Sequence, residues 1–209
     1  MQSDRIKMNL PFNWFDLLIV VVVIVGMQRG RKYGMSEELT RLLKWLAIAV
    51  GCAFFYEPLG TAIASNSVFS LLAGFLMAYL GVGLVIAALF ALLKRAAGEK
   101  WVGKDVFGRS EFYLGMMAGM IRFCCMLIAA LALLNARAYN SAEIRADIKY
   151  QNDLYGSDFF PKFYSLQTQV FESSLAGPWI KQNLSFLLIK PTAPDKDKKN
   201  FKQKESQLP

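Results

Sequence analysis

The sequence predicts an all-α, polytopic membrane protein: about four transmembrane helices, then an amphipathic helical C-terminal region and a disordered tail. Hydrophobic residues make up 55% of the 209 positions and are concentrated in blocks. One block, Val68 to Leu93, runs 26 residues without a charged side chain. A helix of roughly 20 residues crosses the hydrocarbon core of a bilayer, which is about 30 Å thick. Because lipid offers no hydrogen-bond partners, these segments must pair their own backbone groups, which favours helices.

The first predicted span covers about Phe12 to Met27. Basic residues, Arg5 and Lys7, precede it, as they would in a secretory signal. However, the segment Gly26–Arg31 that follows lacks a small-x-small cleavage site. We therefore expect this segment to remain attached as a membrane span.

Three further spans follow. The second covers about Leu42 to Ala64 and is interrupted at Pro58, where we expect a kink or a break. The third is Val68 to Leu93, which is long enough to tilt in the membrane. The fourth covers about Leu114 to Leu134 and carries one charge, Arg122.

The pattern changes after the fourth span, so we divide the chain into a transmembrane domain (1–136), an amphipathic helical region (137–189) and a disordered basic tail (190–209). Ser141 to Tyr155 predicts a helix with Ser141 as its N-cap. Apolar residues from Phe159 to Val170 recur at helical spacing and predict an amphipathic helix, lying in the membrane interface or packed on the bundle. The apolar piece after it, Trp179 to Ile189, is too short to span a bilayer.

Basic residues between the spans predict the topology. The first and third loops hold Arg29, Arg31, Lys32, Arg41, Lys94, Arg95, Lys100, Lys104 and Arg109, and the second loop holds none. The positive-inside rule therefore places the first and third loops in the cytoplasm and both termini outside. The lysine-rich tail is an observation against this assignment, since such clusters often bind anionic lipid at the cytoplasmic face, but long segments translocate largely regardless of charge.

Composition excludes the commonest kinds of enzyme site. The chain has no histidine, and its cysteines, Cys52, Cys124 and Cys125, all lie in apolar runs without metal-ligand spacing. We predict no catalytic residues, no metal and no cofactor. The net charge of +8 comes from residues flanking the spans, so we expect membrane lipids rather than nucleic acid as its counterpart.

Glycines recur every fourth residue at Gly26, Gly30 and Gly34, and again at Gly115 and Gly119. This spacing stacks small residues on one helix face and lets a neighbouring backbone approach closely. The glycines fit packing within one chain, and they also fit contact between copies in a homo-oligomer.

Arg122 is the most unusual charge, because it lies well inside the fourth span. Asp16 is one candidate partner, but in the predicted topology it lies near the opposite face of the membrane. Helical side chains lean toward the N-terminus, which directs Arg122 toward Glu37, Glu38 or Glu111, and we favour these glutamates. Asp16 itself then marks the aqueous end of the first span.

These residues resemble the bacterial colicin V production protein family. The likeness covers roughly residues 14–134 and lies in Trp14-Phe15-Asp16, Arg29-Gly30, Gly34, Glu38-Leu39, Leu42-Leu43-Lys44-Trp45, Leu114-Gly115, Gly119 and Arg122. Glu111-Phe112 stands where the family often has Asp-Arg, and Phe123 where a glycine is common. Beyond Ala136 the likeness is limited to polar, amphipathic character.

The resemblance implies an inner-membrane location and an association with toxin production or export and with envelope homeostasis. It implies no reaction. We therefore expect a non-catalytic protein that acts by binding lipids and other membrane or envelope proteins. The alternative is a small transporter or channel subunit in which Asp16 and Arg122 line a polar path. A path requires both side chains to face one water-accessible cavity, whereas a scaffold requires a dry bundle centre.

Overall fold

The computed structural model describes residues 13–66, 69–97, 108–139, 144 and 163–192, and these are helical apart from turns, short extended pieces and one isolated bridge between Arg137 and Thr192. The helices are α1 (Trp14–Asn66), α2 (Leu71–Ala97), α3 (Glu111–Asn135), α5 (Phe163–Phe171) and α6 (Ala176–Asn183), with short 3-10 turns η2 (Gly108–Ser110) and η3 (Ser185–Leu187). Over the described residues the predicted all-α class is confirmed. Three helical segments are long and apolar enough to cross a membrane: Trp14–Ser65, Leu71–Ala96 and Glu111–Asn135.

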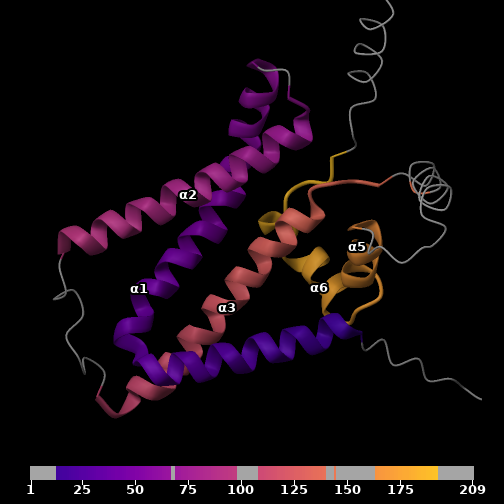
Figure 1. Cartoon of the computed structure of the whole chain (residues 1–209). Helices are drawn as coiled ribbons and strands as arrows, with labels where there is room; N and C mark the ends of the chain where they lie inside the picture. Colours follow the sequence, from indigo (N-terminus) through magenta and orange to yellow (C-terminus); the bar gives the residue numbers. More distant parts are fainter. Residues whose placement is uncertain (1–12, 67–68, 98–107, 140–143, 145–162, 193–209) are drawn as a thin grey trace, which may run out of the picture.

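The first and second predicted spans form one element, α1, instead of two helices joined by a loop. Gly34 interrupts it with φ 73° and ψ 172°, and the chain turns sharply there (Figure 1). Glycine adopts a positive φ without the steric cost of a Cβ, so a single residue replaces the predicted loop. We call residues 14–33 the first arm and residues 35–66 the second arm.

Of the kink or break predicted at Pro58, the break is wrong, because α1 continues as a helix through Pro58 to Asn66. Proline removes one N–H donor from the helix. The hydroxyl of Thr61 donates to the carbonyl oxygens of Glu57 and Pro58, at 3.0 Å each, and so supplies an additional donor in the same turn. The carbonyl that Pro58 leaves without its helical donor is a different one, that of Phe54 four residues earlier.

The long helices pack as two antiparallel pairs that diverge from Gly34 (Figure 1). The first arm lies against α3, with Gly26 beside Gly119. The second arm lies against α2, where a Cβ added at Gly83 would be 3.5 Å from Sγ of Cys52. Large apolar side chains on the outside of both pairs are exposed, including Phe54 at 72%. Such surfaces suit lipid rather than water.

The C-terminal helices close the wide end of this arrangement. We call residues 163–192 the C-terminal strap. Its buried side chains join residues of α1, α2 and α3 in one hydrophobic cluster; the strap contributes Val170, Phe171, Ile180, Leu188 and Ile189. The amphipathic segment that begins with α5 therefore packs on the bundle. Residues 145–162, which include most of the predicted helix Ser141–Tyr155 and also Phe159, lie outside the described residues.

Candidate functional site: two polar locks joined by a glycine seam

The first polar site lies beside Gly34 and contains the buried arginine of the fourth predicted span. Nη1 of Arg122 lies 2.8 Å from Oε1 of Glu38, whose side chain is fully buried. Nη1 of Arg41 reaches the other Glu38 oxygen at 3.2 Å. We call Ser36, Glu38, Arg41, Glu111 and Arg122 the hinge cluster. The structure confirms that Arg122 pairs with one of the favoured glutamates instead of Asp16.

The hinge cluster crosses the break in α1. Arg41 of the second arm also lies over the ring of Tyr33, at 4.2 Å from its centroid, in the first arm. Cation–π contacts of this kind stabilise by roughly 0.5–2 kcal/mol. Arg122 therefore holds α3 to the second arm, while Arg41 holds the two arms to each other.

Glu111 has a different role from the one that the sequence suggested. Its Oε1 accepts a hydrogen bond of 2.6 Å from the backbone N–H of Ser36, at the start of the second arm. A carboxylate at a helix N-terminus satisfies an unpaired N–H and interacts favourably with the helix dipole. An added Cβ at Gly34 would lie 2.8 Å from Cγ of Glu111, so glycine also makes room for this cap.

The predicted glycines form the contact between the first arm and α3, which we call the glycine seam. A Cβ on Gly30 would overlap the carbonyl oxygen of Gly115. A Cβ on Gly119 would overlap the carbonyl oxygen of Gly26 and lie 2.8 Å from Cα of Gly30. Gly34 completes the seam beside Gly115. The contact lies within one chain, and its backbones are too close to admit a side chain between them.

The second polar site lies at the opposite end of the first arm and is built around Asp16. This buried carboxylate accepts three backbone hydrogen bonds: from Asn13 at 3.0 Å and from Leu175 and Ala176 at 3.1 Å each. The last two donors belong to the start of α6, whose N-cap residue, Leu175, has no capping side chain of its own. Asp16 therefore caps a helix about 160 residues further along the chain.

Additional contacts fix the C-terminal strap to both helix pairs. Trp14 donates through Nε1 to the side chain of Gln169 at 2.7 Å, and Asn135 of α3 donates to the carbonyl oxygen of Ile189 at 3.0 Å. Lys190 binds the second arm, where its Nζ lies 2.8 Å from the Glu57 carboxylate. This pairing raises the pKa of Lys190 above its usual value.

The strap continues to Thr192, whose backbone N–H donates to the carbonyl oxygen of Ala136 at 2.9 Å. Ordered contacts thus extend three residues into the range 190–209 that we predicted to be disordered, while residues 193–209 lie outside the described part of the chain. Nothing in the tail's composition indicated this, because Lys190 and Thr192 are held mainly through their own main-chain groups, which bond to the Tyr56 hydroxyl and to the backbone of Ala136 and Ala138, and through one exposed ion pair.

Asp16 is the one candidate residue that the structure separates from the rest. The glycines, Glu38 and Arg122 follow the seam and the hinge, whereas Asp16 lies ten residues, or about 15 Å, before Gly26 on the first arm. Sequence reasoning placed Asp16 at the end of the span but missed its helix cap. A buried aspartate needs hydrogen-bond donors, but the sequence did not point to the start of α6, because Ser174 offers a cap there itself: its hydroxyl accepts from the Gly177 N–H at 2.8 Å.

An all-α membrane protein with a broken first helix, a glycine seam and a docked C-terminal strap is the class that this fold and these sites define. The chain belongs to the colicin V production protein family, whose family model matches residues 15–188. The match extends to residue 188, within the strap, so the prediction of only a general likeness beyond Ala136 is wrong. Comparisons with curated proteins and with solved structures gave no match.

Proposed function

We propose that this protein is a non-catalytic, multi-pass protein of the bacterial inner membrane that supports toxin production or export, or envelope homeostasis, by holding other proteins or lipids. Membership of the colicin V production family supports the general role. The observation that carries the scaffold assignment is that Asp16 and Arg122 are occupied separately, by backbone N–H groups at one end and by Glu38 at the other.

A polar path would need these two side chains to share a water-accessible space. Instead, the glycine seam fills part of the distance between them with backbone in direct contact. Cys125, one turn beyond Arg122 in the direction of Asp16, is buried. Close packing along the seam and the burial of Cys125 favour the scaffold over the transporter or channel alternative.

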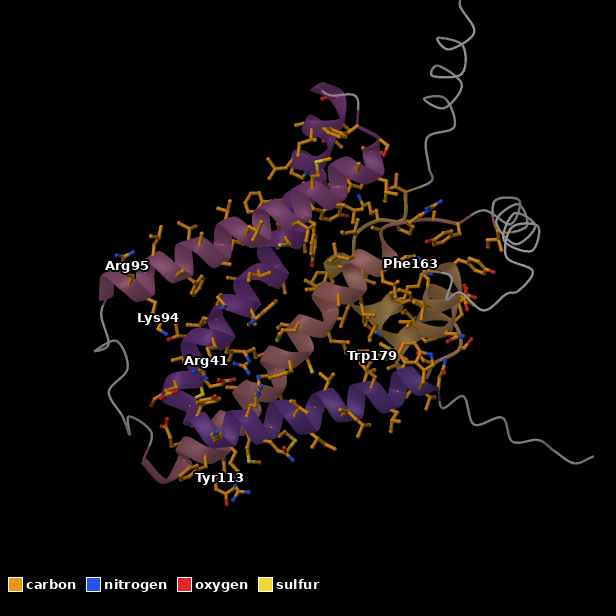
Figure 2. The ribbon with its side chains drawn as sticks, viewed as in Figure 1. Arg41, Lys94, Arg95, Tyr113, Phe163 and Trp179 are labelled. Carbon is orange, nitrogen blue, oxygen red and sulfur yellow. The ribbon has the colours of Figure 1, made fainter. Side chains whose placement is uncertain are left out.

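In the proposed topology the chain crosses the membrane four times, because the break at Gly34 lets α1 cross twice. The first arm of 20 residues would be about 30 Å long, which matches one crossing. The hinge cluster and the basic end of α2, with Lys94 and Arg95, gather at one end of the molecule (Figure 2). The positive-inside rule assigns that end to the cytoplasm and the C-terminal strap to the outside.

The strap offers the surface that would contact a partner. One side of it is buried on the bundle, while Phe163, Trp179 and Phe186 are exposed by 71%, 59% and 65%. Phe163 and Trp179 lie on α5 and α6 respectively (Figure 2). Exposed aromatic side chains on a fixed support are typical of protein interfaces and of the membrane–water boundary.

The test is in-cell crosslinking with a photoreactive amino acid placed at Trp179, with the exposed polar position Thr168 as the matched control. The proposal expects defined envelope proteins or phospholipids to be captured from position 179 and not from position 168. A reconstituted protein that conducts ions or solutes, and that loses this flux in Arg122→Leu, would contradict the scaffold and support the alternative.

A cysteine introduced at Ser206 tests the proposed topology separately. Labelling by a membrane-impermeant reagent from outside the inner membrane is expected. Reaction only after that membrane is permeabilised would place the C-terminus in the cytoplasm.

A further inference from the structure

An apolar groove of about 250 Å³ lies beside the glycine seam. Its lining consists of apolar side chains: Met27, Tyr113, Met116, Met117 and Met120. None of these residues belongs to the polar sites described above.

The groove is a direct consequence of the seam. Met27 follows Gly26, Met116 follows Gly115 and Met120 follows Gly119, so each of these methionines lies one position beyond a glycine of the seam. Because the two helices are antiparallel, residues one position beyond the contact line up on the same side of the pair. Close approach of the backbones then leaves a groove whose walls are these flexible side chains.

Methionine lining suits a flexible hydrocarbon chain. Its unbranched, polarizable side chain adapts to irregular apolar shapes. Both walls belong to helices that are apolar and long enough to cross a membrane, so the groove opens toward lipid. An acyl chain is the apolar molecule present there at the highest concentration.

One end of the groove carries the groups that a phosphate requires. Arg31 follows Gly30 as Met27 follows Gly26, so it lies on the groove side, one turn closer to the hinge, and it is exposed. Tyr113 lies one turn before Met117 on α3; it is 73% exposed and points away from the bundle (Figure 2). Arginine and a tyrosine hydroxyl are both suitable donors to phosphate oxygens.

The charge around this end favours an anion. Arg29 and Lys32 are also exposed on the first arm. Of the nearby acids, Glu38 and Glu111 are buried in the hinge cluster, and the exposed Glu37 is paired with Arg41. Basic pockets between transmembrane helices on the cytoplasmic side bind the headgroups of anionic lipids. The groove supplies the place for the acyl chain, and Arg31 the charge.

We propose that this groove binds one acyl chain of an anionic phospholipid, with the lipid phosphate held by Arg31 and the Tyr113 hydroxyl. The site would make a specific lipid part of the scaffold beside its glycine seam. This inference rests on the proposed membrane scaffold, of which it specifies the lipid.

The test uses the full-length protein in detergent, with binding of phosphatidylglycerol and of phosphatidylcholine with identical acyl chains measured by native mass spectrometry. We expect the parent protein to bind phosphatidylglycerol more tightly than phosphatidylcholine. In Arg31→Gln the affinity for phosphatidylglycerol should fall about five-fold, which is the contribution of one basic residue near an anionic lipid. Arg95→Gln removes the same charge from the same end of the molecule but away from the groove, and should change little. Equal losses in the two variants would overturn the proposal in favour of general electrostatic attraction.

A second measurement locates the lipid directly. Phosphatidylglycerol with a photoreactive group in its acyl chain should crosslink to the α3 segment that contains Met116, Met117 and Met120. Crosslinks spread evenly over α2 and α3 would contradict a lipid site. Neither readout uses a protein partner, so failure here is distinguishable from failure of the crosslinking test at Trp179.

Discussion

At each end of the first arm, a buried carboxylate caps the N-terminus of a helix that is distant in the sequence, but the sequence separation differs between the two ends. At the hinge, Glu111 caps the second arm, 75 residues earlier in the chain. At the other end, Asp16 caps α6, about 160 residues later. Both carboxylates are buried and accept backbone N–H groups, but only the hinge also contains an ion pair between buried side chains. The comparison shows that a buried acid in a membrane helix can serve to dock a distant helix terminus rather than to bind a substrate.

The seam that joins the two ends should be the least tolerant feature. Gly30→Ile places a side chain where the Gly115 carbonyl oxygen lies, and no side-chain movement can relieve a clash between a Cβ and a backbone. We expect folded protein to be lost, measured by yield and by monodispersity in detergent. Gly81→Ala in α2 is the matched control, because nothing lies within 4 Å of an added Cβ there. A well-folded Gly30→Ile protein would contradict the seam.

The hinge ion pair should rank next. Arg122→Leu leaves the buried Glu38 with only the more exposed Arg41, and breaking a buried pair in this way costs about 3 kcal/mol. The measurement is unfolding of the purified protein by denaturing detergent. The double variant Arg122→Leu with Glu38→Leu should recover most of this loss, since no unpaired charge remains. Equal stability of the single variant and the parent protein would show that Arg122 is not paired.

The cap at the other end should have a smaller effect that is confined to the strap. Asp16→Ala removes the acceptor for Leu175 and Ala176, and loss of a helix cap costs about 1–2 kcal/mol. We expect faster proteolysis and faster hydrogen exchange in residues 163–192, with the seam unchanged. Asp16→Asn keeps one acceptor oxygen, so its rates of proteolysis and hydrogen exchange in the strap should lie between those of the parent protein and those of Asp16→Ala. An Asp16→Ala protein that loses the seam as well would remove the distinction between the two ends.

The exposed pair between Lys190 and Glu57 should matter least. Both side chains are largely exposed, and surface ion pairs contribute little to stability. Lys190→Gln should leave the unfolding midpoint almost unchanged, and the same measurement on Glu57→Gln should agree. A large loss in either variant would identify this pair as the main attachment of the strap to the second arm.

Most of the contacts at the hinge could be predicted from the sequence, and few of those made by the strap could, for a physical reason. Glycines at a spacing of four indicate close helix packing in lipid, so the seam could be predicted from a local pattern. A lone arginine in an apolar run needs an acidic partner there, so its pairing with a glutamate could be predicted as well. The cap by Asp16 joins segments far apart in the chain through main-chain donors, which carry no side-chain signature. The single-residue break at Gly34 was missed for a related reason. The basic residues around it indicated a loop, whereas the positive φ of one glycine is sufficient.

The central claim is that Asp16 and Arg122 belong to two separate polar sites with a dry interior between them. The reactivity of Cys125 tests this claim most directly. This native cysteine is buried one turn from Arg122 on the side of Asp16. With Cys52 and Cys124 replaced by alanine, a hydrophilic thiol reagent should leave Cys125 unmodified in native membranes and modify it after denaturation. A cysteine at the exposed position Thr168, in a protein without the native cysteines, serves as the reactive control. Modification of Cys125 in native membranes at the rate of the Thr168→Cys control would show a water-filled path and contradict the account.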